Sequence, residues 1–488
     1  MEIKDLHGAI GNFVRKAYLK KDVVSIYGYG SFFTGKFSEK SDIDIYVVVK
    51  KSDFGLLLRL KKFKNILENY AGMEVFINIL EIGDLPSNSL FYHRDREVLF
   101  SMDFSQKFYH LYGRKIIYNQ NFLYLPSRLI DECLRNIHVL LYISKKLVIN
   151  EKQDIVDQSY DRRDIVKDFV KSLKYVNLLN GKYTYSADET VETFLSFAEN
   201  PRAEYMKRIK SYLIKNDLRN LVSNTKELYF STKIDENDVK RIIDMFEFIV
   251  STLLDYFKKF DFLRGVKYTK NIEIKGMLFK RYKSPVAKNI LFLPGMPNNP
   301  SDEFMWNYTL FGNIFLLENI NFSELTNSKE SLDSFFNTLE NISKLLHVDT
   351  IFAASFSTIF LSKLSKIKGI KKIILLSPIL TANRINKKLV AKAVREWMAQ
   401  NKIKEDLGIF EVALSYEKLL QLPIRQKRMY IAYSTYNDRS LSQKAEIKRF
   451  EEQKDILVAH TSKRLHGYKL IADFDIWAGM LKFLGDER

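Results

Sequence analysis

The sequence predicts a multidomain protein of mixed α/β and α+β class, and three observations support this. Its 488 residues are too many for a single ordinary core and suggest about three domains. Hydrophobic residues make up 46% of the chain, which allows full cores and excludes a disordered chain. The spacing of apolar residues also changes twice along the sequence, near residues 120 and 265. We therefore expect domains at residues 1–120, 121–265 and 266–488.

The charge of the chain indicates which partners it could bind, and its cysteine content indicates its cellular compartment. With 77 Lys and Arg against 59 Asp and Glu residues, the formal net charge is +18, which favours polyanionic ligands such as nucleotides or RNA; a solvated Lys-rich surface explains it equally well. The single cysteine, Cys133, lies among apolar residues of an expected helix, so we expect a buried, inert thiol. No signal-peptide pattern opens the chain and no apolar stretch is long enough to span a bilayer, so we expect a cytoplasmic protein without a membrane partner.

A small-residue turn and two spaced aspartates stand out in the first domain, after an amphipathic helix expected over residues 1–22. Residues 23–27 predict a strand, and the turn that follows ends in Gly30-Ser31, where small side chains let backbone N–H groups approach a phosphate. A second strand is expected over residues 42–49, and its alternation puts Asp42 and Asp44 on one face. Neighbouring carboxylates repel each other unless they bind a cation, and Mg²⁺ prefers oxygen ligands shared with phosphates.

These residues resemble the signature of the DNA polymerase β-like nucleotidyltransferases, in which Gly-Ser and a spaced Asp-x-Asp fall on consecutive strands. Gly35 also fits the Gly-Ser-x-x-x-Gly form of that signature. The resemblance implies that Gly30 and Ser31 bind ATP or another nucleoside triphosphate, and that Asp42 and Asp44 bind Mg²⁺. It further implies transfer of a nucleoside monophosphate to a hydroxyl group of an acceptor, which can be a small molecule, a protein or RNA.

The resemblance also implies a third carboxylate on the next strand, expected over residues 72–79. Glu74 is the candidate, both as a metal ligand and as a group that helps to deprotonate the acceptor, and it shares a face with Asn78. Asn78 and Glu81 are alternatives within reach of the same strand. Residues 113–118 resemble the Gly-x-x-x-x-Tyr ending of the catalytic domain in small-molecule nucleotidyltransferases, and so place the end of the first domain near residue 120.

From residue 121 to 265 apolar residues recur at spacings of three and four, which predicts a helical domain. The clearest helices are expected near residues 129–148, 163–179, 188–198, 201–214 and 238–262. Residues 172–182 and 186–190 resemble the helical second domain of aminoglycoside adenylyltransferases over one helix, a Gly-Lys turn and the capped start of the next helix. The likeness implies a domain that binds substrate or a partner, and a helical packing unit without such a role fits the same residues.

From residue 266 strands alternate with helices, which predicts a parallel sheet covered by helices on both faces. Strands are expected at residues 270–282, as one strand or a hairpin, and at 289–293, 313–317, 350–354, 372–376, 428–433 and 454–459. A helix is expected at residues 329–346, and a charged helical insertion at 382–420, where lids often lie.

Residues 352–357 place Ser355 between small side chains, at the junction of an expected strand and helix. Only small residues fit two positions either side of a nucleophile in so tight a turn, and Ala353 and Ser357 stand there. The pattern predicts a nucleophile elbow and resembles the α/β-hydrolase fold over residues 270–485.

That resemblance implies a nucleophile, acid and histidine in this order along the chain. Ser355 is the expected nucleophile, Asp438 the residue that orients the imidazole, and His466 the general base. The backbone N–H groups of Phe356 and Met296 are expected to form the oxyanion hole. Such a site would cleave an ester, thioester or amide bond through an acyl-Ser355 intermediate.

Other residues compete for these roles or depart from the pattern. Asn437 adjoins the expected acid, and His460 is a second histidine at the last strand. Pro294-Gly295 stands where the family often has His-Gly. The expected function is therefore a bifunctional enzyme, a nucleotidyltransferase joined to a serine hydrolase. The alternative is a catalytically inactive regulatory or RNA-binding protein built from the same folds, since a fold does not guarantee its chemistry.

Overall fold

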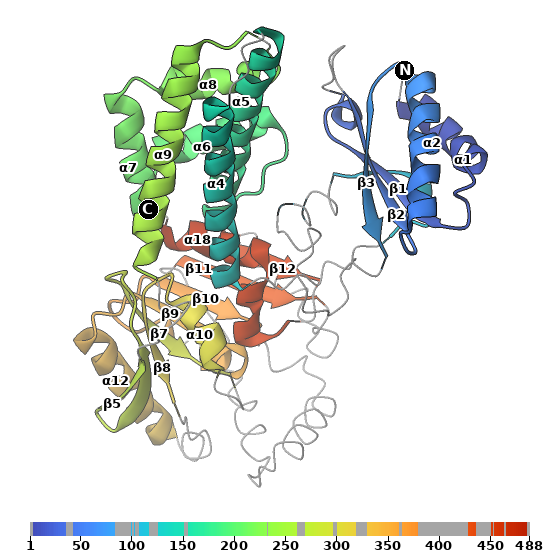
Figure 1. Cartoon of the computed structure of the whole chain (residues 1–488). Coiled ribbons are helices and arrows are strands. Elements are labelled where there is room, and N and C mark those ends of the chain that lie inside the picture. The colour runs from blue at the N-terminus through green and yellow to red at the C-terminus, as the bar shows by residue number, and fades with distance from the viewer. Residues whose placement is uncertain are drawn as a thin grey trace. The chain divides into compact units, whose positions relative to one another are not determined.

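The computed structural model (Figure 1) describes residues 3–35, 42–82, 99, 102, 107–116, 125–150, 155–231, 233–260, 269–295, 300–318, 329–360, 364–378, 428–435, 450–451, 453–462 and 465–485. The chain splits into two compact units, Met1–Phe122 and Leu123–Arg488. The long helices and the large sheet both belong to the second unit. The insertion expected at residues 382–420 lies outside the described residues, as do Met296, Asn437 and Asp438.

The first unit is a four-stranded sheet with helices on one face. Its strand order is β3-β2-β1-β4, formed by β1 (Val23–Tyr29), β2 (Ile43–Val49), β3 (Val75–Glu81) and β4 (Tyr109–Gly113). β2 and β3 run parallel, whereas β1 is antiparallel to both β2 and β4. Helices α1 (Ile3–Lys16) and α2 (Phe54–Ala71) cover one face of this sheet (Figure 1), with a short 3₁₀ helix, η1 (Phe32–Thr34), after β1.

Alternation along β2 separates the two faces of this sheet. Ile43, Ile45 and Val47 are buried in the core that α1 and α2 complete. Asp44 and Tyr46 therefore lie on the opposite face, where Tyr46 belongs to a smaller apolar cluster. The helices close one face by burying its apolar side chains, and the aspartate is left on the other.

The second unit begins with six helices: α4 (Pro126–Ile149), α5 (Ile155–Leu179), α6 (Ala187–Glu199), α7 (Glu204–Lys215), α8 (Arg219–Leu228) and α9 (Glu236–Lys258). The expected cap of α6 is present, because the Ser186 hydroxyl accepts a hydrogen bond from the Glu189 N–H at 3.2 Å. Helix α8 was not predicted from the sequence. This helix has ten residues, of which Leu221, Val222 and Thr225 are buried, too few for a clear helical period.

An eight-stranded sheet forms the rest of the second unit, in the order β12-β11-β10-β9-β7-β8-β6-β5. The strands are β5 (Thr269–Ile274), β6 (Met277–Tyr282), β7 (Asn289–Leu293), β8 (Asn313–Leu317), β9 (Thr350–Ala354), β10 (Lys372–Leu376), β11 (Arg428–Ser434) and β12 (Ile456–Thr461). β5 and β6 form an antiparallel hairpin, β6 is antiparallel to β8, and the other neighbours are parallel. This is the mainly parallel sheet that the alternation of strands and helices predicted.

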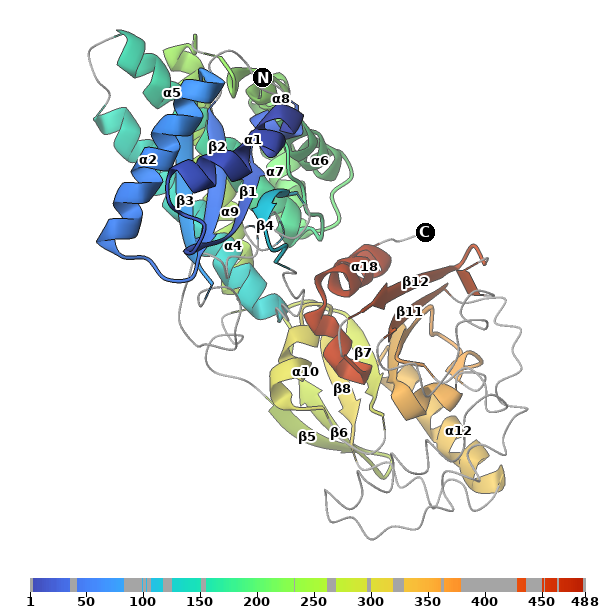
Figure 2. The same cartoon turned by 90° about the vertical axis from the view of Figure 1, so that its right-hand side faces the viewer.

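Helices cover both faces of the large sheet (Figure 2). α12 (Lys329–Leu345) buries Phe336, Leu339 and Ile342 in the core on one face. α18 (Phe474–Gly485) packs on the other, where the Tyr430 hydroxyl of β11 donates to the Ile476 carbonyl at 3.0 Å. Shorter elements are α10 (Asp302–Tyr308) and two 3₁₀ helices, η4 (Ser355–Phe360) and η5 (Gly467–Ala472). None of the helices in the described part of the chain has both the length and the apolar composition that crossing a membrane requires.

Candidate active sites

Ser355 lies in a strained turn directly after β9. Its φ of 47° falls in the left-handed region, which disfavours side chains with a β-carbon. Ala353 and Ala354 before it, and Ser357 after it, are buried, so larger side chains would not fit at these positions. The backbone passes from strand to 3₁₀ helix at this residue. The turn has the geometry of a nucleophile elbow, and it holds the serine at the carboxyl edge of the sheet.

His466 reaches Ser355 from the segment between β12 and η5. Its Nε2 lies 2.9 Å from the Ser355 Oγ, within hydrogen-bonding distance. His460 is the competing histidine, but it lies within β12, is exposed, and contacts the ring of Tyr433 instead. The structure thus brings together the expected nucleophile and base, across 111 residues of sequence.

The surroundings of His466 favour its neutral form. The surrounding protein atoms, together with the Lys469 ammonium group, lower the pKa of the His466 imidazole below its ordinary value. The residue as a whole is exposed, so solvent moderates this effect. A neutral imidazole next to a serine hydroxyl can accept its proton, which is the requirement for a general base.

The loop after β7 packs directly on the elbow. A β-carbon added at Gly295 would lie 2.7 Å from the Ser355 Cβ and 3.1 Å from the Ala354 carbonyl oxygen, so only glycine fits here. The Ser357 hydroxyl donates a hydrogen bond to the Pro294 carbonyl in the same loop. Ser357 therefore ties the elbow to this loop. The Phe356 backbone lies in η4, whereas Met296 lies outside the described residues.

The acid of the expected triad, Asp438, and its neighbour Asn437 also lie outside the described residues. Asp473 is a buried carboxylate in the same region, but its oxygens have other partners. Its Oδ1 accepts hydrogen bonds from the N–H groups of Asp475 and Ile476 at the start of α18, and its Oδ2 accepts one from the Thr461 hydroxyl at 2.7 Å. Asp473 therefore caps α18, and the acid role stays assigned to Asp438 as a prediction.

In the first unit, Gly30 and Asp44 lie against each other at the end of β1. Gly30 has a φ of +82°, and a β-carbon there would lie 2.7 Å from the Asp44 Oδ2. Tyr29 and Asp44 are paired residues of β1 and β2, which explains the close approach. Ser31 follows as the residue that precedes η1. Glycine is thus required both by the backbone conformation and by the neighbouring carboxylate.

The register of β2 and β3 locates the candidate third carboxylates. Asp44 pairs with Phe76, and the exposed Glu74 lies just ahead of β3, where its carbonyl oxygen accepts the Ile43 N–H at 2.8 Å. Glu81 lies five residues beyond Phe76, or about 16 Å along the strand. Its carboxylate accepts hydrogen bonds from the Ser52 hydroxyl and N–H, which lower its pKa. The Glu81 carboxylate is therefore hydrogen-bonded to Ser52, at the opposite end of the strand from Asp44.

Asn78 faces the same side of the sheet as Asp44. Its side-chain amide donates to the Tyr29 hydroxyl at 2.6 Å. The ring of Tyr29 in turn packs against Tyr46 and Phe108, with centroids 4.7 and 5.1 Å away. Asn78 is thus held in an aromatic cluster by a hydrogen bond.

The fit of these carboxylates to a Mg²⁺ ion depends on how many of them lie together. Among the residues that the structure describes, no three His, Cys, Asp or Glu side chains are grouped as metal ligands. Asp42, Asp44 and Glu74 are all described and do not form such a group, so the structure does not bring Glu74 to the pair, and its role as a third ligand stays a prediction. Mg²⁺ commonly uses one or two carboxylates together with substrate phosphates and water, and the pair Asp42 and Asp44 is compatible with that.

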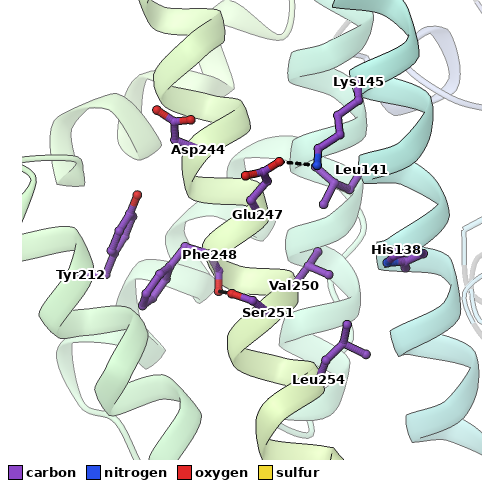
Figure 3. A pocket seen from close by; sticks show the side chains of 10 residues that line it. All are labelled: His138, Leu141, Lys145, Tyr212, Asp244, Glu247, Phe248, Val250, Ser251 and Leu254. Atoms are coloured by element: carbon purple, nitrogen blue, oxygen red, sulfur yellow. Dashed lines mark hydrogen bonds and ion pairs between the residues drawn. The ribbon is translucent and has the colours of Figure 1, made fainter.

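A surface groove crosses the helices α4, α7 and α9 (Figure 3), with a volume of ≈ 620 Å³. Lys145 of α4 forms an ion pair with Glu247 of α9 across it. The rings of Tyr212 and Phe248 stack at 3.8 Å between centroids. The groove therefore has a mixed polar and aromatic lining, in the part of the chain predicted to bind substrate or a partner.

A family match covers part of the first unit. Residues 14–100 match the family described as Polymerase beta, Nucleotidyltransferase, which confirms the resemblance predicted there. A search of the curated proteins gave no significant match.

Among solved structures, the chain is similar to several hydrolases. An alpha/beta fold family hydrolase from Bacillus anthracis is 11% identical to this chain, with a TM-score of 0.31. The match covers 45% of this chain and 99% of the hydrolase. An alpha/beta hydrolase fold protein from Chitinophaga pinensis is 11% identical over 46% of this chain and 98% of its own, with a TM-score of 0.32. The 2,6-dihydroxy-pseudo-oxynicotine hydrolase is 11% identical over 65% of this chain and 95% of its own, with a TM-score of 0.32.

Proposed function

We propose that the chain is a bifunctional enzyme, and that its C-terminal part hydrolyses an ester, thioester or amide through an acyl-Ser355 intermediate. The observation that carries this proposal is the 2.9 Å contact between the His466 Nε2 and the Ser355 Oγ at a strained strand-to-helix turn. A strained turn of this kind presents the nucleophile side chain at the edge of the sheet, where a substrate can reach it. The lowered pKa of His466 keeps its imidazole ready to accept a proton.

The chemistry follows from these positions. As the Ser355 Oγ attacks the substrate carbonyl carbon, its proton passes to the His466 Nε2. The Phe356 N–H, directly after the nucleophile, is the expected donor to the developing oxyanion. His466 then protonates the leaving alcohol, thiol or amine, and the acyl group stays on Ser355. In the second half, His466 removes a proton from water as the water oxygen attacks the acyl carbon. The bond between the acyl carbon and the Ser355 Oγ then breaks, the Oγ takes the proton back from His466, and the acid is released. Asp438 is the residue expected to orient the imidazole.

A fluorophosphonate probe tests this proposal, because it reacts covalently with activated serines. We expect the wild-type chain to be labelled at Ser355, and Ser355→Ala to abolish the labelling. His466→Ala should reduce labelling by several orders of magnitude, since the base and nucleophile act as a unit. His460→Ala is the matched control and should label like wild type. Equal loss in both histidine variants would contradict the assignment of the base.

Nucleotidyl transfer is the second proposed activity, favoured by the family match at residues 14–100 and by the contact of Gly30 with Asp44. Gly30 and Ser31 would hold the triphosphate through the backbone. Asp42 and Asp44 would hold Mg²⁺, which when bound neutralises phosphate charge. Asp44, held beside the turn, would keep nucleotide and acceptor aligned for in-line displacement.

Pyrophosphate release from ATP or another nucleoside triphosphate, measured with Mg²⁺ and candidate hydroxyl-bearing acceptors, tests this second activity. Asp44→Asn should abolish transfer while Ser355 labelling stays intact, because the change removes a charge and barely alters volume. Transfer near the wild-type rate in Asp44→Asn would contradict the site. If neither activity is found and the chain binds RNA in a salt-sensitive way, the inactive RNA-binding alternative is supported instead.

A further inference from the structure

Ser377 stands beside Ser355 at the carboxyl edge of the large sheet. β10 ends at Leu376, which pairs with Ala354 at the end of β9. Each strand is followed by a serine in the left-handed region, with a φ of 47° at Ser355 and 52° at Ser377. Ser377 is also buried, with 5% of its surface exposed. Backbone conformations of this kind are sterically disfavoured and cluster at functional sites.

Two hydrogen bonds connect Ser377 to its surroundings. Its N–H donates to the Ala432 carbonyl of β11 at 2.7 Å, which fixes its backbone to the sheet. Its Oγ accepts the N–H of Gly467 at 2.9 Å. Gly467 directly follows His466, has a φ of +56° and lies next to Ala354, where an added β-carbon would come within 3.9 Å of that residue's Cβ. One hydrogen bond thus joins Ser377 to the peptide unit that carries His466.

We propose that Ser377 is a positioning residue for His466, an inference that rests on the proposed hydrolase function of Ser355. His466 is exposed, so side-chain packing alone holds its ring weakly, and the backbone must set its direction. By accepting the Gly467 N–H, Ser377 fixes the peptide between His466 and Gly467, and the Nε2 is then aimed at the Ser355 Oγ. Glycine would adopt the same φ without steric cost, so serine is present for the acceptor that glycine lacks.

Tyr308 supplies a second anchor for this turn. Its hydroxyl donates to the Tyr468 carbonyl at 2.8 Å, and its side chain is fully buried. This anchor acts two residues after His466, whereas Ser377 acts on the adjoining residue. Loss of the Ser377 acceptor would leave the buried Gly467 N–H without its partner, and the turn would move to find another. A displacement of about 1 Å in a catalytic group costs about 10²-fold in rate.

The test compares four variants of the full-length chain, measuring the rate of fluorophosphonate labelling at Ser355 across the acid and neutral pH range. Ser377→Ala and Ser377→Gly remove the acceptor, and Ser377→Asn restores one at a residue that tolerates a positive φ. Ser284→Ala is the matched control. The buried Ser284 hydroxyl also accepts a hydrogen bond from a backbone N–H, that of Val286 at 3.0 Å, but it lies in the turn between β6 and β7.

We expect labelling to fall about 10²-fold in Ser377→Ala and Ser377→Gly, to recover in part in Ser377→Asn, and to be unchanged in Ser284→Ala. The fall should nearly vanish in a His466→Ala background, since Ser377 acts through that residue. Wild-type labelling in Ser377→Ala, or a fall as large in Ser284→Ala, would overturn the inference. The inference would also be overturned if Ser377→Ala lowered the labelling rate in the His466→Ala background as much as it does in the wild-type background.

An NMR titration of His466, assigned from His466→Gln, separates this inference from the proposed function. In Ser377→Ala the pKa of His466 should return towards its ordinary value, because a displaced ring moves away from the protein atoms and the Lys469 ammonium group that lower it. If the wild-type chain is not labelled at Ser355, the proposed hydrolase function fails, and this titration alone decides the positioning role. An unchanged His466 titration in Ser377→Ala would then overturn it.

Discussion

Replacing Gly295 with alanine should disable the hydrolase site by displacing its backbone. The new methyl carbon would lie 2.7 Å from the Ser355 Cβ and 3.1 Å from the Ala354 carbonyl oxygen. Ordinary contacts between carbon atoms are about 3.5–4.0 Å, so one side must move by about 1 Å. Ser355 and Ala354 are fixed by the end of β9, and the loop that contains Gly295 must therefore yield.

The displaced loop carries Pro294, whose carbonyl accepts the Ser357 hydroxyl, and leads to the expected oxyanion donor Met296. A shift of about 1 Å at such a site corresponds to about a 10²-fold loss in rate, which is about 2.7 kcal/mol of transition-state stabilisation. Overpacking adds a loss of about 1–3 kcal/mol in the free energy of unfolding. The assays are fluorophosphonate labelling of Ser355, hydrolysis of an activated ester, and thermal unfolding.

Gly479→Ala is the control that separates overpacking from displacement of the site. Its methyl carbon would clash with the Tyr430 hydroxyl between α18 and β11. We expect Gly479→Ala to lower the melting temperature as Gly295→Ala does, but to label at the wild-type rate once corrected for the folded fraction. A wild-type labelling rate in Gly295→Ala, or the same loss in both variants, would refute the reasoning.

Three further predictions concern pH and the first unit. Ser355 labelling should rise with pH through an inflection below about 6.5, because a lowered folded-state pKa keeps His466 neutral to lower pH. The part of the free energy of unfolding that depends on His466 should likewise decline as the pH falls from about 6.5 towards that pKa. A labelling inflection above 6.5 in a pH–rate profile would contradict this. Asp44→Asn should abolish pyrophosphate release. Glu81→Gln should leave the release near the wild-type rate, because the Glu81 carboxylate is hydrogen-bonded to Ser52 at the far end of β3. Loss of pyrophosphate release in Glu81→Gln would reassign the third carboxylate. Gly30→Ala should abolish nucleotidyl transfer and lower the free energy of unfolding by about 1–3 kcal/mol in a urea titration. Alanine is strained at a φ of +82°, and its methyl group would clash with Asp44. Wild-type transfer and stability in Gly30→Ala would exclude the phosphate-turn role.

The nucleophile elbow and every described strand except β4 were readable from the sequence, because their signals are local. Alternation marked the faces of β2, and the small residues around Ser355 marked the elbow, each within a few neighbouring positions. Strand ends shifted by one to three residues, as at β3, which begins at Val75 where residue 72 was expected. The helix α8 was missed because ten residues with a polar majority give too weak a period.

Long-range relations depended on the tertiary structure. The sequence favoured His466 over His460 as the base because His460 falls on the last strand, and the tertiary structure added the close approach of the His466 Nε2 to Ser355. The strand period placed Glu74 and Asn78 on one face, and only the β2–β3 register showed Glu81 to lie at the opposite end.

Ser377 had no signal in the sequence at all. Its positive φ and its hydrogen bond to Gly467, 90 residues away in the chain, arise where parallel strands end at a common edge. The sequence by itself determined most of the segments that form strands, long helices and tight turns, because propensity and period act between near neighbours. Which serine, histidine and glycine meet at the end of β9 was decided by strand order, since the sheet brings together residues that no local pattern connects.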